Sequence, residues 1–172
     1  MKIAFAGGEI RPWTLADVPD LASLADNRNV WRNLRDRFPN PYTKGDAREW
    51  VRGVNRQSPI AHLAIAWDGA LAGGIGILLQ EDVHQGTAEI GYWLGEPFWG
   101  QGIMTAALSA FSDFAFEAFK LRRLYAQVLH WNPASMRVLE KAGYVLEGRM
   151  RCSAIKDGQV ADELLYARIQ VL

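Results

Sequence analysis

The segment from Ala88 to Ala107, AEIGYWLGEPFWGQGIMTAA, joins a strand pattern to a helix pattern through a turn that is broken by glycines. Gly100 and Gly102 free the backbone for conformations that other residues avoid, and they let a ligand approach the main chain closely. The helix that begins near Ile103 has no charged side chain at its start. Its first N–H groups have no partners within the helix, and together with the helix dipole they favour an anion. This segment therefore predicts a strand–loop–helix unit that binds a phosphate or pyrophosphate.

The rest of the pattern predicts one α+β domain over residues 1–172, with a mixed, mostly antiparallel sheet flanked by helices. Asp68-Gly69 and Asp157-Gly158 favour hairpin turns, and Thr14 with Asp17 resembles a capping box. The expected strands are Glu9–Trp13, His62–Trp67, Leu71–Leu79, Thr87–Leu94, Arg123–Leu129, Tyr144–Ile155 and Val160–Ile169. The expected helices are Leu15–Ala25, Asn27–Leu34, one capped by Thr43 and running to Asn55, Ile103–Lys120, and one that starts at Pro133 and stops at Gly143.

Composition excludes several classes of partner. Nineteen basic residues offset nineteen acidic ones, so no overall field attracts nucleic acid or an anionic membrane. No apolar run is long enough to span a bilayer, and the N-terminus lacks the pattern of an export signal. Cys152 is the single cysteine, which rules out an internal disulfide and fits a reducing compartment. We therefore expect a cytoplasmic protein.

Other phosphate-binding and catalytic motifs are missing. No Gly-Lys-Ser/Thr follows the glycines, and neither Gly73–Gly76 nor Gly100–Gly102 completes G-x-G-x-x-G. His62, His84 and His130 lie in separate segments without metal-ligand spacing, and there is no G-x-S-x-G elbow. Kinase, dehydrogenase, hydrolase and metalloenzyme functions are therefore disfavoured, and no metal is expected.

What remains resembles the GNAT superfamily of acetyl-CoA-dependent N-acetyltransferases, and within it the RimJ/RimL type that acts on ribosomal-protein N-termini. The resemblance covers nearly the whole chain. It is carried by Ile10-Arg11-Pro12, by Ala88–Leu108, by NPASMRVLEKAGYVLEG from Asn132 to Gly148, and by the late Asp-Gly hairpin. It implies a fold with splayed central strands, acetyl-CoA as cosubstrate, and direct attack of a primary amine without a covalent acetyl-enzyme.

The acyl-CoA loop of that family follows the pattern Gln/Arg-x-x-Gly-x-Gly/Ala, which falls here on Trp99–Met104. Gly102 matches the internal glycine, whereas Trp99 and Met104 replace the polar first and the small last residue. Main-chain donors do not depend on side-chain identity, so we still expect pyrophosphate binding. The alternative is a tight turn without a ligand. The residues implied in cofactor binding are Trp93, Leu94, Gly100, Gln101, Gly102, Ile103, Met104, Thr105, Asn132 and Ser135.

The resemblance also implies that the pantetheine arm inserts between the strands Ala88–Leu94 and Leu124–Leu129. A bulge near Trp93 and Leu94 would aim an N–H at the thioester carbonyl. Asn132 would lie beside the thiol arm, or it is simply the N-cap of the following helix.

Two residues are candidates for the chemistry. Glu89 is the candidate general base, and its alternative is a solvated strand carboxylate. Ser135, or a water that it holds, could protonate the leaving thiolate, although a serine at a helix start is often only a cap. Many relatives place a tyrosine four residues later, where this chain has Leu139.

The acceptor is the open question. By analogy, Asn27–Thr43 and the hairpin tip Arg151–Gln159 flank its entrance. The first segment offers Arg28, Trp31, Arg35, Arg37, Phe38 and Tyr42, which could bind an acceptor or form a solvated face. A protein or peptide N-terminus is favoured over a small-molecule amine such as a polyamine. A non-catalytic acyl-CoA sensor and an interaction scaffold are the alternative functions, and a homodimer is possible.

Overall fold

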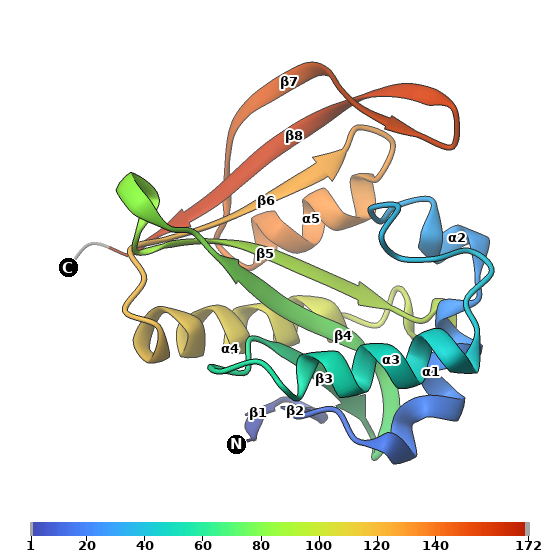
Figure 1. The fold of residues 1–172 in the computed structure, drawn as a ribbon. Coiled ribbons are helices and arrows are strands. Elements are labelled where there is room, and N and C mark those ends of the chain that lie inside the picture. The colour runs from blue at the N-terminus through green and yellow to red at the C-terminus, as the bar shows by residue number, and fades with distance from the viewer. Residues whose placement is uncertain (1, 171–172) are drawn as a thin grey trace.

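The computed structural model describes residues 2–170 and contains an eight-stranded sheet with helices on both faces (Figure 1). The strands are β1 Ile3–Phe5, β2 Gly8–Arg11, β3 His62–Trp67, β4 Ala70–Leu79, β5 Thr87–Leu94, β6 Arg123–Leu129, β7 Val145–Lys156 and β8 Gln159–Ile169. The α-helices are α1 Val18–Ala25, α2 Arg28–Trp31, α3 Lys44–Val54, α4 Ile103–Ala118 and α5 Pro133–Lys141. The sheet order is β1-β2-β3-β4-β5-β6-β8-β7, and only β5 and β6 pair in parallel. The α+β, mostly antiparallel prediction is confirmed.

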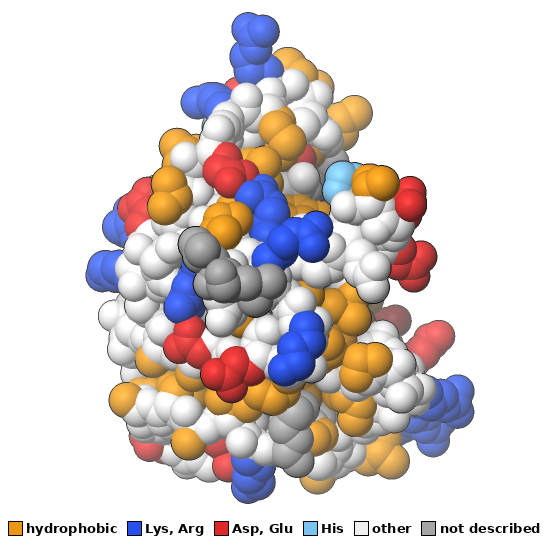
Figure 2. All heavy atoms as spheres, turned by 90° about the vertical axis from the view of Figure 1, so that its left-hand side faces the viewer, with side chains coloured by type: hydrophobic (Ala, Val, Ile, Leu, Met, Phe, Trp, Pro, Cys, Tyr) orange, Lys and Arg blue, Asp and Glu red, His pale blue; other side chains and the backbone are white. Residues whose placement is uncertain are grey.

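Two apolar clusters pack on the two faces of the sheet. The larger one joins Phe111 and Leu108 of α4 and Leu139 of α5 to inward residues of the sheet. The smaller one joins Leu21 of α1 and Val51 of α3 to the other face. Within residues 2–170, no helix combines the length and apolarity needed to cross a membrane. Figure 2 shows Lys and Arg interspersed with Asp and Glu on one face, in keeping with the balanced charge.

The helix starts follow the local signals in the sequence. Thr14 and Asp17 form the expected capping box at a short 3-10 turn, Leu15–Asp17, that leads into α1. Thr43 forms a second capping box with Asp46 at the start of α3. Each box satisfies N–H groups that the first helical turn leaves without partners.

The predictions differ from the structure mainly at element ends. Strand β1 was not expected, and the strand expected over Glu9–Trp13 is β2, Gly8–Arg11. The helix expected over Asn27–Leu34 ends as the single turn α2, because the chain after Trp31 continues in turns toward the sheet. Helix α4 ends at Ala118, two residues before Lys120, which adopts a positive φ of 53°.

The central strands diverge. Strands β3, β4 and β5 form the expected antiparallel meander. Strand β5 then pairs with β6 only over Thr87–Glu89, opposite Arg123–Tyr125. Beyond these pairs the two strands separate, as Figure 1 shows. We call the unpaired stretch, Ile90–Leu94 against Ala126–Leu129, the β5/β6 opening.

Gly73 of β4 sets how closely the end of β5 can approach, because a Cβ there would lie 2.1 Å from the Trp93 carbonyl oxygen. We expect Gly73→Ala to lower the free energy of unfolding by about 1–3 kcal/mol through overpacking. Gly91→Ala on β5 is the control, since nothing lies within 4 Å of its Cβ position. Urea denaturation measures both, and equal losses of stability would contradict this account.

Candidate functional site

The loop between β5 and α4 presents a row of unpaired main-chain donors. Gly100 and Gly102 have φ values of 74° and 78°, and Gly102 is the N-cap of α4. Among the described residues, the N–H groups from Gly100 to Thr105 have no hydrogen-bond acceptor. A Cβ at either glycine would meet no atom within 4 Å, so the surface over the loop is open. Converging donors at an accessible helix N-terminus fit a diphosphate.

Two side chains of this loop stabilise it by hydrogen bonds to the main chain. The Trp99 indole N–H donates to the Leu94 carbonyl oxygen at 2.9 Å. The Gln101 side-chain amide donates to the Pro97 carbonyl oxygen at 3.0 Å. Trp99, at the position where the family pattern has a polar residue, thus ties the loop to the end of β5.

Unpaired main-chain groups also line the β5/β6 opening. Gly95 N–H donates to the Ala72 carbonyl oxygen at 2.8 Å, and bonds to β4 recur at alternate residues. Trp93 therefore pairs with β4, whereas the main-chain groups of Tyr92 and the N–H of Leu94 are left free toward β6; the Leu94 carbonyl oxygen is taken by the Trp99 indole. On β6, the His130 N–H donates to the Asp162 carbonyl oxygen at 3.0 Å, which shows that every second residue of β6, counted from His130, bonds to β8.

By that alternation, Gln127 and Leu129 face β5 across the opening. The bulge expected near Trp93 and Leu94 is wrong, because β4 and β5 pair in continuous register from Leu79↔Ala88 to Gly73↔Leu94. Divergence of the strands, rather than a bulge, frees the Leu94 N–H.

Glu89 is held by an arginine from a distant loop. It is the last residue of β5 that pairs with β6, opposite Tyr125. Its side chain is 17% exposed, and Arg35 forms an ion pair with it. The same Arg35 guanidinium donates to Gln127 Oε1 at 3.2 Å. Arg35 therefore bridges the two strands where they separate, and Glu89 is not a freely solvated carboxylate.

Ser135 and Asn132 lie at the start of α5. Asn132 Oδ1 accepts from the Ser135 N–H at 3.2 Å, so its expected role as N-cap is confirmed. Ser135 Oγ is 2.8 Å from the hydroxyl of Tyr92. Burial raises the pKa of Tyr92 even though the bond to Ser135 opposes this, so the phenol stays protonated at neutral pH.

Sequence reasoning missed Tyr92, although its alternation with Glu89 indicated opposite faces of β5. Glu89 faces the α1 and α3 side together with Trp93, whereas Tyr92 packs against the core under α4 and α5. Leu139, at the position where many relatives have a tyrosine, is fully buried. A tyrosine hydroxyl thus reaches Ser135 from the strand instead of from the helix.

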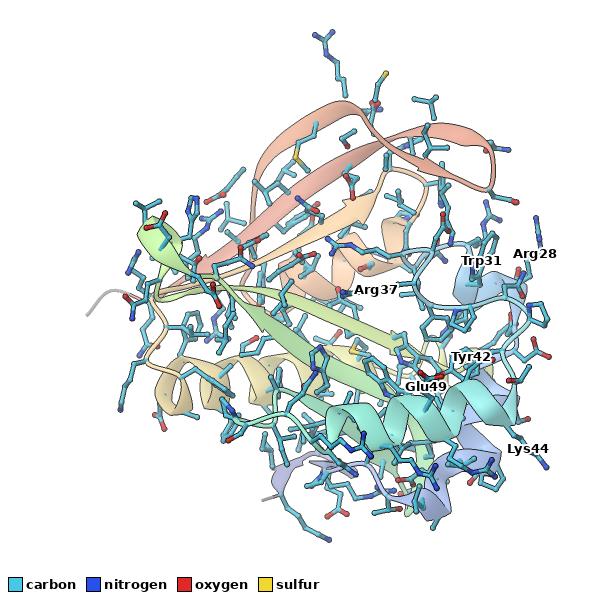
Figure 3. The ribbon with its side chains drawn as sticks, in the orientation of Figure 1. Arg28, Trp31, Arg37, Tyr42, Lys44 and Glu49 are labelled. Atoms are coloured by element: carbon cyan, nitrogen blue, oxygen red, sulfur yellow. The ribbon has the colours of Figure 1, made fainter. Side chains whose placement is uncertain are left out.

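The residues suggested for the acceptor entrance divide into two groups. Arg28 pairs with Asp157, and the Lys156 ammonium lies 3.5 Å from the centre of the Trp31 ring, so Arg28 and Trp31 hold the β7–β8 tip (Figure 3). Lys156 is buried and also pairs with Asp36 at 2.7 Å.

Phe38 and Tyr42 anchor the loop to the sheet side of the molecule. Phe38 packs edge-on against Trp93, with ring centres 5.5 Å apart, and it also contacts Tyr42. Burial, and secondarily the charge of Asp46, raises the pKa of Tyr42 to about 12. These aromatic residues position the loop that carries Arg35 and Arg37.

Comparison with known proteins agrees with this geometry. The family model described as an acetyltransferase (GNAT) domain matches residues 9–145. The structure of the RimL ribosomal L7/L12 alpha-N-protein acetyltransferase in complex with coenzyme A has a TM-score of 0.86 at 27% identity, covering 98% of each chain. Mycobacterium smegmatis RimJ in complex with CoA-disulfide has a TM-score of 0.85 at 25% identity, covering 98% of this chain and 86% of that one.

Among curated proteins, the ribosomal-protein-serine acetyltransferase of Escherichia coli strain K12 is 40% identical over 83 residues, which is 48% of this chain and 46% of that protein. The chain spans about half the length of the curated relatives it matches. The family model covers most of the chain, and the expected family is confirmed. The chain belongs to the GNAT acetyltransferase family.

Proposed function

We propose that this protein transfers the acetyl group of acetyl-CoA to the N-terminal α-amine of a protein or peptide. The observation that carries the proposal is the β5/β6 opening, which lies between the donor-rich loop before α4 and Glu89. An opening through the middle of a sheet gives a cosubstrate access to both faces. Solved relatives with this fold were crystallised with coenzyme A or acetyl-CoA.

In this proposal the diphosphate of acetyl-CoA binds the N–H groups from Gly100 to Thr105. The pantetheine amides pair with the exposed main chain of Tyr92, as an added strand would, because the Leu94 carbonyl oxygen already accepts from the Trp99 indole. The free Leu94 N–H is the donor for the thioester carbonyl, where negative charge develops during attack. The neighbouring Trp93 shapes the acceptor side of the strand, and Asn132 orients Ser135.

Glu89 and Ser135 divide the proton transfers between the two faces. The amine nitrogen attacks the thioester carbon from the Glu89 side and loses a proton to that carboxylate, directly or through water. As the C–N bond forms, the C–S bond breaks, and the thiolate takes a proton from the Ser135 hydroxyl or from a water that it holds. Ser135 regains its proton from water, and Glu89 releases the proton it took to solvent, so both groups are reset. For this to occur, Arg35 must yield the Glu89 carboxylate to the incoming amine.

Proton chemistry favours an α-amine. At pH 7, deprotonating an α-ammonium with a pKa near 7.9 costs about 1.2 kcal/mol, whereas a lysine ammonium near 10.4 costs about 4.6 kcal/mol. Glu89, a single and partly buried carboxylate, is better matched to the smaller free-energy cost of deprotonating an α-ammonium. Two solved relatives support the same choice: one is named as a ribosomal L7/L12 alpha-N-protein acetyltransferase, and the other is described as modifying the N-terminal serine of L7/L12.

Gly102→Ala tests the cofactor loop. We expect coenzyme A to bind roughly 10- to 100-fold more weakly, because strain at a positive φ disturbs donors to a charged group. Gly158→Ala in the β7–β8 turn is the matched control, with φ 73° and the same open space at Cβ. Thermal shift with coenzyme A measures both, since a ligand of the native state raises Tm. A full shift in Gly102→Ala would refute the assigned loop.

Glu89→Gln tests the base. With serine-initiated peptides and acetyl-CoA, we expect kcat/KM to fall at least about 10²-fold, the usual range for loss of a general base. Glu147→Gln is the control, because Glu147 also forms an ion pair with an arginine, Arg123, at 2.5 Å. Release of free coenzyme A thiol measures turnover. Coenzyme A binding without turnover on any peptide or amine would favour a non-catalytic sensor.

A further inference from the structure

Next to Glu89, the acceptor side of the sheet includes two glycines, which carry no side chains. We call the surface formed by Gly91, Gly76 and His62 the floor. Gly91 lies two residues after Glu89 on the same face of β5; it is exposed, and nothing lies within 4 Å of its Cβ position. It pairs with Gly76 of β4, which is covered by the ring of His62 from β3. An extended chain could therefore lie across the strands from Glu89 toward His62.

The loop above this floor alternates its charged side chains. Arg35 pairs with Glu89 of β5, whereas Asp36 pairs with Lys156 at the β7–β8 tip. Arg37 is exposed and forms no ion pair within residues 2–170. Figure 3 shows the Arg37 side chain extending from the loop toward the middle of the molecule. The aromatic contact of Phe38 with Trp93 anchors the loop directly after it.

The effect of Arg37 on the pKa of His62 indicates that the two side chains are near each other. Burial lowers the pKa of His62, and the positive charge of Arg37 lowers it further. His62 also contacts Gln57 Oε1 through Nδ1 at 3.0 Å. The imidazole is therefore neutral at neutral pH, and Arg35 already neutralises Glu89. Arg37, in contrast, keeps a positive charge with no ion-pair partner among residues 2–170.

We propose that Arg37 selects peptide acceptors that carry a carboxylate at position two or three, where position one is the residue with the reacting α-amine. Neighbouring strands lie about 4.8 Å apart, so β3 is roughly 10 Å from β5. An extended peptide covers about 3.3 Å per residue, which brings the second or third side chain to Arg37 when the amine is at Glu89. Polyamine acceptors would be repelled. This inference rests on the proposed peptide acetyltransferase activity.

The test compares C-terminally amidated peptides that differ only by Glu or Gln at position two or three. For the wild-type protein at low salt, we expect kcat/KM to favour the Glu peptide by at least about threefold, the scale of a partly exposed ion pair. In Arg37→Gln the ratio falls to one. Arg48→Gln on α3 is the control, an exposed arginine with no ion pair in the described chain. It keeps the wild-type ratio.

A second measurement checks the placement of Arg37 independently of turnover. In an NMR titration of the histidine ring protons, Arg37→Gln raises the pKa of His62 and Arg48→Gln leaves it unchanged. Equal kcat/KM for Glu and Gln peptides in the wild type, or a preference that survives in Arg37→Gln, would overturn the proposal alone. If no peptide is acetylated while a polyamine or amino acid is, the proposed function fails with it.

Discussion

The separation of β5 from β6 after three residue pairs is the constraint on which the site depends. A sheet interior normally pairs its main-chain groups, and leaving them unpaired away from water is costly. Here the edges of both strands expose such groups along the β5/β6 opening. Alternation along β5 puts Glu89 on one face of the opening and Tyr92 with Ser135 on the other. An opening flanked by an acid on one face and a hydroxyl pair on the other suits a reaction that moves protons on both sides.

The segment between α2 and α3 completes the acceptor side through long-range ion pairs. Arg35 contacts both strands at the opening, while Asp36 joins the loop to the buried Lys156 of the β7–β8 tip. Trp31 lies under the same ammonium. Because successive side chains of the loop point to different partners, the loop is fixed at several points, and Arg37 is left to face the floor.

Local signals in the sequence predicted much of the fold. The capping boxes at Thr14 and Thr43, the Asp-Gly turns and the glycines before α4 each act within a few residues, so their chemistry can be inferred from neighbouring letters. The ion pair of Arg35 with Glu89 and the bond of Tyr92 to Ser135 could not, because they join residues 54 and 43 positions apart. The expected bulge failed for a related reason, since the pairing of whole strands decides where an N–H is freed.

Amide hydrogen exchange, with and without coenzyme A, tests the central role of the opening most directly. The account predicts that the Tyr92 and Leu94 amides, which face β6, exchange quickly in the free protein and slow at least about tenfold when coenzyme A is added. The Gly91 and Trp93 amides, already paired with β4, change little. Unchanged exchange at Tyr92 and Leu94 at saturating coenzyme A would show that the cosubstrate does not enter between these strands.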